Sequence, residues 1–333
     1  MRMKYRTLVV CPPDKEKYVF PSVILEEIRQ LTDCPWPVLD PANWRNAKPA
    51  LKEADIIFST WGMPSMSEEF LAAAPVLKAV FYAAGTVKGF VTGEGWDRGI
   101  IVSSAWAANS VPVAEYTLAT ILLSLKRFWH FSRASRSDDG QPEVQTVPGA
   151  YHTKVGLISM GAVGRATARL LQPFDFTLLA YDPFFSPKLA SELNIGLVPL
   201  GELFRECDVI SIHAPWTPET ERMITGNLIA SMKEGATLIN TSRGAVVAED
   251  EMIDVLARRP DLSAVLDVTH PEPAARDSLL KSLPNVVLTP HIAGSMQREC
   301  ERMGKWMVDE LRRFLAGEPL RYMVTREQLA RMA

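Results

Sequence analysis

The sequence has few of the residues from which metal centres and disulfide frameworks are built. Its 333 residues include only four cysteines and five histidines. The cysteines are far apart and show no CxxC spacing, and no two histidines form an HxxxH pair. We therefore expect no metal site, and the cysteine usage favours a reduced, cytoplasmic protein with buried thiols.

The chain also lacks a long apolar run and a strongly basic tract. No apolar stretch approaches the ~18 residues that a transmembrane helix needs. The N-terminus has a short apolar run followed by charges, which is unlike a signal peptide. With a net charge of −3, neither a membrane nor a nucleic acid is an expected partner.

What the chain does contain is an alternation of short apolar runs with amphipathic stretches. Such alternation predicts an α/β fold with parallel sheets, and the length suits two domains. In the first part we expect strands at 8–10, 56–59, 79–82 and 100–102, helices at 20–31 and 67–74, and a glycine-rich loop at 83–96. A long apolar helix at 113–131, started by Asn109 and Pro112, and a polar linker at 132–149 then follow.

A second series of elements begins near Lys154. The expected strands are 155–158, 177–181, 209–213, 236–240, 264–267 and 286–289. The expected helices are 165–172, 203–207, 228–232, 251–257 and 295–315, with Gly317 just past the last one.

The stretch from Val155 to Asp182 has the layout of a dinucleotide-binding unit: strand, tight turn, helix, strand and acid. Free N–H groups at the helix start would face a pyrophosphate, and the terminal Asp182 would accept hydrogen bonds from the adenosine ribose. Ser159 stands where the first glycine of a G-x-G-x-x-G turn is expected. This costs about 1 kcal/mol if that residue needs a positive φ. No arginine follows Asp182, so we predict NAD in preference to NADP.

Chemically informative residues follow the later strands. Arg243, Asp267, Glu272 and His291 all come at or just after predicted strand ends, where open parallel sheets bind ligands. Arginine offers a two-pronged donor for the oxygens of a 2-oxo acid. Histidine can transfer one proton near neutral pH, and an adjacent carboxylate orients an imidazole and raises its pKa. This set suits the reduction of a 2-oxo acid.

Taken together, these segments resemble the D-isomer-specific 2-hydroxyacid dehydrogenases. The matching stretches are AGTVKGFV (84–91), NSVPVAEYTLATILLSLKR (109–127), VGLISMGAVGR (155–165), YDP (181–183), HAPWTPET (213–220), LINTSRGAVV (238–247), LDVTHPEP (266–273) and NVVLTPHIAGS (285–295). The resemblance implies an NAD-dependent enzyme that interconverts a small 2-oxo acid and its D-2-hydroxy acid. The segment DVTHPEP is similar to the glycerate and hydroxypyruvate reductase branch.

The resemblance also implies roles for individual residues. The catalytic set is Arg243 for substrate binding, His291 as proton donor and acceptor, and Glu272 as its partner. Asp267 would contact the nicotinamide carboxamide. Substrate would also contact Ala84, Gly85, Thr86 and Trp61. The remaining cofactor contacts would come from Ser159, Met160, Gly161, Ala162, Val163, Gly164, Asp182, His213, Ala214, Pro215, Thr241, Ser242 and Gly294, in addition to Arg243 and His291.

The implied architecture is two Rossmann- or flavodoxin-like domains with a cleft between them. The NAD-binding domain, 109–293, would be inserted into a substrate domain made of 1–108 and 294–333. The apolar helix at 113–131 suggests a homodimer interface.

Other interpretations remain open at this stage. His213 before a proline is more easily a structural residue lining the adenine side than a catalytic one. His270 stands near Glu272 but need not act directly, and Trp61 could be a packing residue. A corepressor-like protein of the same fold could keep Arg243, Glu272 and His291 to bind NAD with little turnover.

Overall fold

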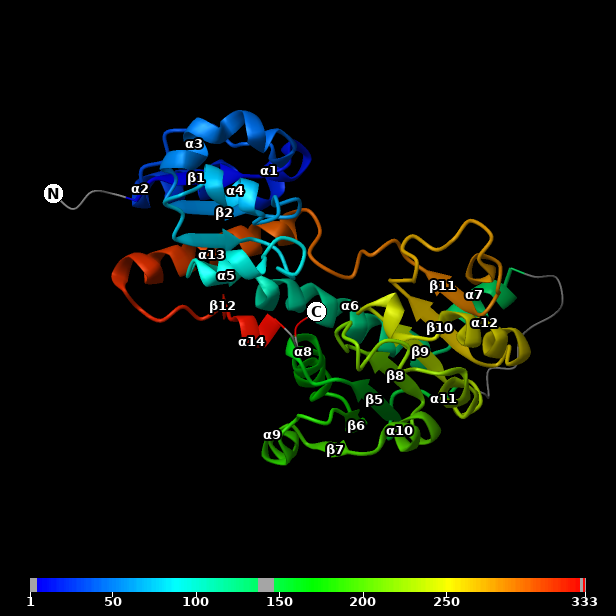
Figure 1. The fold of residues 1–333 in the computed structure, drawn as a ribbon. Helices are drawn as coiled ribbons and strands as arrows, with labels where there is room; N and C mark the ends of the chain where they lie inside the picture. Colours follow the sequence, from blue (N-terminus) through cyan, green and yellow to red (C-terminus); the bar gives the residue numbers. More distant parts are fainter. Residues whose placement is uncertain (1–4, 137–146, 330–331, 333) are drawn as a thin grey trace. The chain divides into compact units, whose positions relative to one another are not determined.

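A computed structural model describes residues 5–136, 147–329 and 332. The chain divides into two compact units. The first comprises Met1–Asn109 together with Ser295–Ala333, and the second is the continuous segment Ser110–Gly294 between them. Each unit is an α/β structure built on its own sheet (Figure 1). The predicted fold class, α/β with two parallel sheets, is therefore confirmed.

The first unit is organised around a five-stranded sheet. Its strand order is β1 (Thr7–Val10), β2 (Ile56–Ser59), β3 (Ala79–Tyr82), β4 (Ile101–Ser104) and β12 (Met323–Val324). The first four strands are parallel and β12 is antiparallel to β4. The helices are α1 (Pro13–Val19), α2 (Ser22–Leu31), η1 (Pro41–Ala47), α3 (Lys48–Glu53), α4 (Glu68–Ala73), α5 (Gly93–Asp97), α13 (Arg298–Ala316) and α14 (Arg326–Leu329).

Strand alternation explains why this sheet is covered on both faces. Neighbouring strand residues point to opposite sides, so Leu8 and Val10 join one hydrophobic cluster while Val9 joins another. The first cluster is completed by α3 and α4, and the second by α1, α2 and α13. A strand buried on both faces reads as a continuous apolar run, which is why these strands were recognisable in the sequence.

The second unit contains a seven-stranded, wholly parallel sheet. Its order is β11 (Val286–Leu288), β10 (Ser263–Leu266), β9 (Thr237–Asn240), β8 (Val209–Ile212), β5 (Lys154–Ile158), β6 (Thr177–Tyr181) and β7 (Ile195–Leu197). Its helices are α6 (Trp106–Leu125, beginning in the first unit), α7 (Phe128–Ala134), α8 (Ala162–Leu171), α9 (Pro187–Glu192), α10 (Leu200–Glu206), α11 (Gly226–Ala230), η3 (Gly244–Val246), α12 (Glu249–Arg258) and η4 (Leu279–Lys281).

The same alternation builds two cores in this unit. Ile210 and Ile212 of β8 pack with α10, α11 and α12, whereas Val209 packs on the other face with α6, α8 and α9. The strand order reverses between β5 and β8, because β6 follows β5 on one side and β8 lies on the other. Such a reversal leaves a crevice at the carboxyl ends of the strands.

The predicted helix at 113–131 is wrong at both ends. Helix α6 begins at Trp106 and carries Pro112 inside it, and it ends at Leu125. Arg127 then takes a left-handed conformation with φ 49° before the separate helix α7. A proline inside a helix removes one backbone hydrogen bond. Here burial of Ala108, Val113 and neighbouring side chains outweighs that local signal.

Several further boundaries differ from the prediction. The glycine-rich loop at 83–96 ends in helix α5, whose cap is the Thr92 hydroxyl accepting from Gly95 N. The predicted linker at 132–149 is helical up to Ala134, and its residues 137–146 lie outside the described part of the chain. The short elements η1, α1, α3, α9, α14, η3, η4, β7 and β12 were not predicted.

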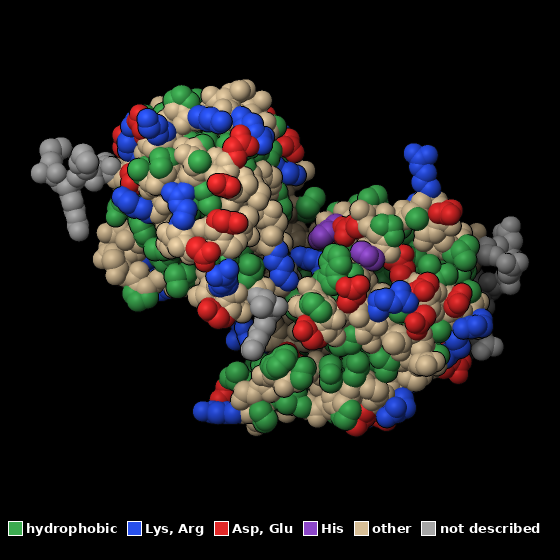
Figure 2. Space-filling view, in the orientation of Figure 1, with side chains coloured by type: hydrophobic (Ala, Val, Ile, Leu, Met, Phe, Trp, Pro, Cys, Tyr) green, Lys and Arg blue, Asp and Glu red, His purple; other side chains and the backbone are tan. Residues whose placement is uncertain are grey.

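Charged side chains of both signs are interspersed over the face shown in Figure 2, and no extended patch of one sign is visible there. None of the helices in the described residues is long and apolar enough to cross a membrane.

Candidate active site

The site residues come together because the second sheet is parallel. Asp182, His213, Thr241, Asp267 and Thr289 each directly follow the last residue of a strand, so all five lie at the carboxyl edge of one sheet. The segments carrying the three predicted catalytic residues follow β9, β10 and β11, which are adjacent strands. The predicted cofactor residues of the turn, Asp182 and the segment 213–215 follow β5, β6 and β8, and the other predicted cofactor residues follow β9, β10 and β11 together with the catalytic ones. All of them therefore lie at the carboxyl ends of the strands of one parallel sheet.

Arg243 lies on a loop whose shape is set by Asn240 at the end of β9. Asn240 Oδ1 accepts from the backbone N and the hydroxyl of Ser242, at 3.0 and 2.8 Å, and its Nδ2 donates to the Arg243 carbonyl at 3.0 Å. The Arg243 Nη1 donates to the Ser242 carbonyl at 2.6 Å. Burial lowers the pKa of Arg243, and the Glu272 charge acts in the opposite direction. An arginine stays protonated at neutral pH, so this is a partly desolvated cation.

Glu272 and His291 form a direct pair. Their Oε1 and Nδ1 atoms lie 2.5 Å apart, and the side chains are 40% and 49% exposed. His291 has φ 53°, a conformation uncommon outside glycine, and its N–H bonds to the Asp267 carbonyl at 2.9 Å. A backbone outlier held in this way is typical of functional sites. Because Glu272 engages Nδ1, Nε2 is the nitrogen left to meet a substrate.

Asp267 is buried and nearly saturated with hydrogen bonds. Its Oδ1 accepts from the Thr289 hydroxyl at 2.6 Å and from Ile292 N at 2.8 Å. Its Oδ2 accepts from Ala293 N at 2.9 Å. This carboxylate therefore holds the segment that carries His291, in addition to any contact with a cofactor.

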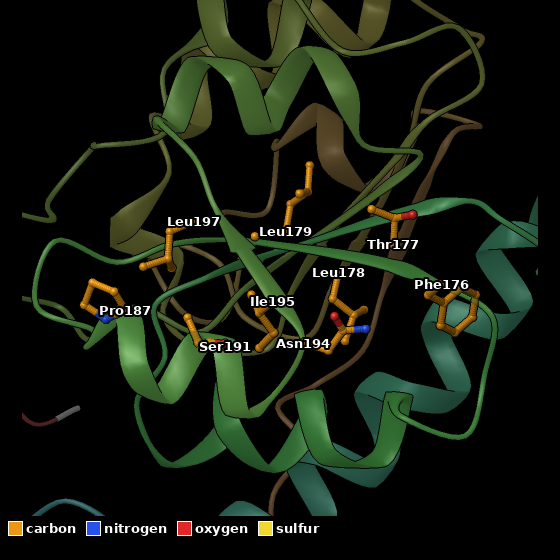
Figure 3. A pocket seen from close by; sticks show the side chains of 11 residues that line it. Phe176, Thr177, Leu178, Leu179, Pro187, Ser191, Asn194, Ile195 and Leu197 are labelled. Carbon is orange, nitrogen blue, oxygen red and sulfur yellow. The ribbon is translucent and has the colours of Figure 1, made fainter.

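A pocket of about 490 Å³ lies beside the Glu272–His291 pair. It is lined by Asp267, Thr269, Glu272, Pro273, Ala274, Lys281, Leu288, Thr289, Pro290 and His291. A larger hollow of about 640 Å³ lies elsewhere in the unit, against β6, β7 and α9 (Figure 3). None of the predicted site residues lines the larger hollow, and neither does any ionisable side chain. Only the smaller pocket has groups for acid–base chemistry.

The turn after β5 has the geometry that a dinucleotide phosphate needs. Ser159 has φ 72°, so the irregular position does use the left-handed region and the cost of about 1 kcal/mol applies. A Cβ on Gly164 would lie 2.2 Å from the Ser159 carbonyl oxygen, so only glycine fits there. Gly161 precedes α8, and a Cβ on it would meet nothing within 4 Å. Ala162 and Val163 begin α8. The space above Gly161 is open.

Two further residues complete this half of the site. Asp182 Oδ2 accepts from Met160 N at 2.7 Å, and its Oδ1 accepts from Phe184 N at 2.8 Å, so the carboxylate is tied to the turn. His213, at the reversal of strand order, is 9% exposed and neither ring nitrogen has a hydrogen-bond partner in the described structure. Burial lowers its pKa to about 4. An orphaned buried imidazole and a cradle that excludes Cβ both fit a polar dinucleotide.

The other predicted cofactor residues lie around this edge. Ala214 is buried, and the Pro215 carbonyl accepts from the Thr220 hydroxyl at 2.5 Å. Thr241 is buried, with its hydroxyl 3.3 Å from that of Thr117 on α6. Gly294 is the last residue of the unit.

The predicted substrate contacts Trp61, Ala84, Gly85 and Thr86 belong to the first unit. Ala84 is fully buried and follows β3 closely, and the Ser104 hydroxyl donates to the carbonyls of Ala84 and Gly85. Among the described residues, no acceptor is found for the N–H groups of Gly85 and Thr86. Two adjacent donors of this kind can hold a carboxylate.

Three residues of this site, Asn240, Tyr116 and Thr289, were not predicted from the sequence. Asn240 shapes the Arg243 loop, and Tyr116 on α6 has its hydroxyl 3.1 Å from that of Thr289. The His270 ring packs edge-on against Trp216 with ring centroids 5.3 Å apart, and the His270 backbone N–H donates to Glu249 Oε2 at 2.8 Å. The only sequence signals were the position of Asn240 at a strand end and of Thr289 beside Pro290.

The family model of the D-isomer specific 2-hydroxyacid dehydrogenase NAD-binding domain matches residues 118–293. The chain belongs to this family. The match covers most of the second unit and includes all three predicted catalytic residues. It confirms the resemblance drawn from the motifs and identifies the dinucleotide as NAD.

Known proteins of this family resemble the chain along most of its length. It is 32% identical over 269 residues to a D-3-phosphoglycerate dehydrogenase of Mycobacterium tuberculosis, covering 81% of this chain and 51% of that protein. The chain thus spans about half the length of the curated phosphoglycerate dehydrogenases it matches. A glyoxylate reductase of Korarchaeum cryptofilum is 32% identical over 80% of this chain and 82% of its own. Among solved structures, a D-lactate dehydrogenase of Aquifex aeolicus with NAD and lactic acid is 27% identical, with a TM-score of 0.69 over 94% of this chain and 96% of its own.

Proposed function

We propose that this chain interconverts a small 2-oxo acid and its D-2-hydroxy acid with NAD as the redox partner. The observation that carries the proposal is the 2.5 Å contact between Glu272 and His291 at the same sheet edge as the partly desolvated Arg243. A cation for an acid group and a histidine–carboxylate pair for one proton are the two functions that this reaction asks of the protein.

Arg243 would bind the substrate. One Nη1–H is used to hold the loop through the Ser242 carbonyl, which leaves most of the guanidinium donors for the substrate carboxylate and the C2 carbonyl oxygen. Partial burial strengthens these bonds because less water competes for them.

His291 would move the proton. NAD(H) supplies or accepts the hydride at C2 of the substrate. In reduction, the protonated Nε2 donates to the carbonyl oxygen as the C=O double bond becomes a C–O single bond. In oxidation, neutral Nε2 takes the hydroxyl proton. Glu272 keeps Nδ1 protonated and offsets the positive charge of the imidazolium.

The cofactor would lie along the turn after β5, beside Gly161, with its adenosine ribose at Asp182 and His213 at the strand reversal. A carboxylate at the end of β6 accepts bonds from ribose hydroxyls and repels a 2′-phosphate. The three residues after it, Pro183, Phe184 and Phe185, supply no cation to offset such a phosphate.

The substrate is proposed to be small, with glyoxylate and hydroxypyruvate first, because two relatives that the chain matches over 82% and 84% of their length are named glyoxylate reductase and hydroxypyruvate reductase. The decisive experiment is a panel of NADH oxidation with glyoxylate, hydroxypyruvate, pyruvate, phenylpyruvate and branched 2-oxo acids. NADH binding is measured in parallel by fluorescence. Turnover on at least one acid, lost in Arg243→Ala but not accompanied by loss of NADH binding, is expected. Tight NADH binding with no turnover on any acid would instead favour an NAD-sensing protein.

A homodimer is proposed through α6 and α7. Helix α7 has no fully buried residue in the described part of the chain although it contains Phe128, Trp129 and Phe131, and Phe128 is 45% exposed. Nearby Tyr151 is also exposed. An aromatic helix of this kind is stabilised by a partner surface. Sedimentation of the purified protein tests the proposal, and a monomer at micromolar concentration would contradict it.

A further inference from the structure

A chain of three side chains runs from helix α6 to the cofactor edge of the second sheet. The Tyr116 hydroxyl lies 3.1 Å from the Thr289 hydroxyl, and the Thr289 hydroxyl lies 2.6 Å from Asp267 Oδ1. Tyr116 comes from a helix, Thr289 follows β11 and Asp267 follows β10. The chain therefore ties three separate elements to one carboxylate.

The direction of these hydrogen bonds can be deduced. An ionised carboxylate only accepts, so the single hydroxyl proton of Thr289 is used on Asp267. Thr289 can then contribute only a lone pair to its second contact, and Tyr116 must be the donor. Burial raises the pKa of Tyr116, as does the nearby Asp267 charge, while the bond to Thr289 lowers it. The phenol stays protonated and able to donate at neutral pH.

The acceptor sites of Asp267 can be counted in the same way. A carboxylate offers about four lone-pair sites. Oδ1 accepts from Thr289 and Ile292 N, and Oδ2 accepts from Ala293 N. One position, on Oδ2, is left. A carboxamide N–H is a donor that suits such a position, whereas a carboxylate is not.

We propose that Tyr116 is a positioning residue that, through Thr289, holds Asp267 in the orientation required to accept a hydrogen bond from the nicotinamide carboxamide. The inference rests on the proposed cofactor contact of Asp267. Tyr116 acts here without touching the cofactor: removing its hydroxyl frees Thr289 to rotate, and Oδ1 loses a fixed partner. The consequence is a loss of discrimination between an amide and an acid on the pyridine ring.

The alternative is that Tyr116 only packs α6 against the sheet. Helix α6 makes a second contact of the same type, between Thr117 and Thr241 at 3.3 Å, so a purely structural tie is conceivable. The two interpretations differ in one measurable property. If Tyr116 has only a structural role, its loss should change the affinity for every dinucleotide alike. If Tyr116 orients Asp267, its loss should change only the affinity for a dinucleotide that carries the carboxamide.

The test compares the binding of NAD⁺ with that of its nicotinic acid analogue, which carries a carboxylate in place of the carboxamide. Calorimetry on the chain, with no substrate present, gives both dissociation constants, and the quantity compared is the Kd of the acid analogue divided by the Kd of NAD⁺. We expect Tyr116→Phe to weaken NAD⁺ binding about fivefold, which is the effect of one hydrogen bond. Binding of the acid analogue should change little, so the ratio also falls about fivefold.

Three variants at Thr289 and Thr120 test whether the effect depends on the Thr289 hydroxyl. Thr289→Val should lower the ratio at least as much, and Thr289→Ser, which keeps the hydroxyl, should restore it. Thr120→Val is the matched control, because Thr120 lies one turn further along α6 and, among the described residues, its hydroxyl bonds only to the Tyr116 carbonyl of its own helix. An unchanged ratio in Tyr116→Phe, or an equal loss for both dinucleotides, would overturn the inference.

The experiment also separates this inference from the proposed reaction. If the wild-type protein binds NAD⁺ more tightly than the acid analogue and the variants lose that preference, the positioning role of Tyr116 is supported even if no 2-oxo acid in the panel is reduced. If a 2-oxo acid is reduced but the ratio is the same in all variants, the proposed reaction stands and the role of Tyr116 does not.

Discussion

Gly244 lies directly against the backbone of Thr269. A Cβ on Gly244 would be 2.0 Å from the Thr269 carbonyl carbon and 2.6 Å from His270 N. The glycine therefore allows the loop carrying Arg243 to touch the loop carrying Glu272. The spacing of the two charged groups depends on the absence of one methyl group.

We expect Gly244→Ala to destabilise the protein and to impair catalysis. Overpacking against rigid backbone costs about 1–3 kcal/mol, or more where nothing can move. The melting temperature and the kcat/KM of the folded fraction should both fall. Gly89→Ala is the control, because a Cβ there meets nothing within 4 Å. If Gly244→Ala had the same stability and activity as this control, the close contact would not exist in solution.

The roles of the two neighbouring histidines can be separated. His291→Ala should reduce turnover by about 10²–10⁴, the usual effect of removing a general acid–base group, with NADH binding little changed. His270→Ala should keep turnover within a few-fold, because its ring contacts Trp216 and not Glu272. Steady-state kinetics on the best 2-oxo acid measure both. The reverse order of effects would exchange the roles of the two residues.

The selectivity for NAD is expected to depend on the charge of Asp182. Asp182→Asn keeps an acceptor for Met160 N but removes the repulsion of a 2′-phosphate. The ratio of kcat/KM for NADH over NADPH should fall about tenfold or more, which corresponds to ~1.4 kcal/mol. Asp182→Ala should lower it similarly while also loosening the turn. If neither variant changes this ratio, Asp182 does not determine the preference for NADH over NADPH.

The buried His213 makes a prediction about acid stability. Burial lowers its folded-state pKa to about 4, below the ordinary value of 6.5, so the unfolded chain binds the proton more readily. Stability from this group is present above pH 6.5 and is lost as pH falls towards 4. At pH 5 the loss is on the order of 2 kcal/mol.

Urea unfolding of the cofactor-free protein at pH 7.5 and pH 5.0 measures this effect. The wild-type protein should lose about 2 kcal/mol more than His213→Gln between the two values, since glutamine does not titrate. Equal pH dependence in the two proteins would mean that His213 is hydrated or charged in the folded state.

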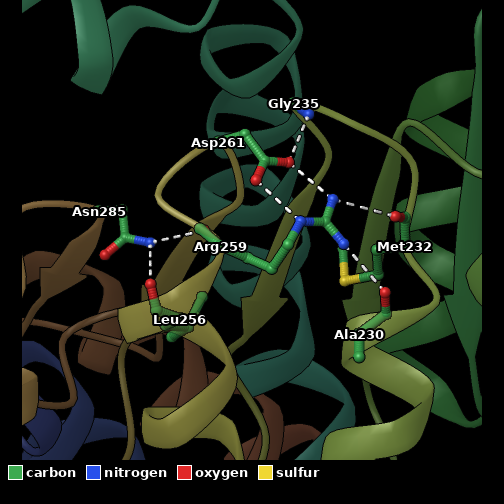
Figure 4. A network of polar contacts seen from close by, with 7 residues as sticks. All are labelled: Ala230, Met232, Gly235, Leu256, Arg259, Asp261 and Asn285. Carbon is green, nitrogen blue, oxygen red and sulfur yellow. Dashed lines mark hydrogen bonds and ion pairs between the residues drawn. The ribbon is translucent and has the colours of Figure 1, made fainter.

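Arg259 stabilises the end of the second sheet at which β9 and β10 begin, opposite to the end that carries His291. It makes a two-pronged bond to Asp261, at 2.8 and 2.7 Å, and its Nη1 donates to the Ala230 carbonyl at 2.9 Å (Figure 4). Arg259→Ala should cost about 1–3 kcal/mol, because bonds to a charged group are lost and carbonyls lose a donor. Chemical unfolding measures the loss.

The adjacent Arg258 is exposed and makes no ion pair among the described residues, so Arg258→Ala is a matched control. The turnover of folded Arg259→Ala should equal that of the wild type, because the network lies at the end of the sheet opposite to His291. A stability loss as large in Arg258→Ala would show that the network contributes nothing specific.

The sequence was sufficient for the strands of both sheets other than β7 and β12, and for the family. A strand buried on both faces reads as a nearly continuous apolar run, so runs such as 56–59 and 79–82 were predicted with their observed bounds. The motifs around Arg243 and His291 identified the family because they combine rare charged residues with strand ends. Both features depend on residues that are close together in the chain, so they can be recognised from the sequence alone.

Other features were decided only when the chain folded. The start of α6 was misplaced because Asn109 and Pro112 carry a helix-start signal that burial of the helix overrides. The left-handed Ser159 and His291 could not be predicted as such, since the hydrogen bonds and packing that hold them come from other strands.

The sequence alone determined which chemical groups are available: a guanidinium, an imidazole, carboxylates and a glycine turn at strand ends. The family resemblance added the pairing of Glu272 with His291. The tertiary structure decided the other contacts: it bound Asp267 to the segment around His291 and connected Tyr116 to Asp267 through Thr289. The physical reason is that hydrogen bonds act over about 3 Å, whereas these residues are separated by 19 to 173 positions in the chain.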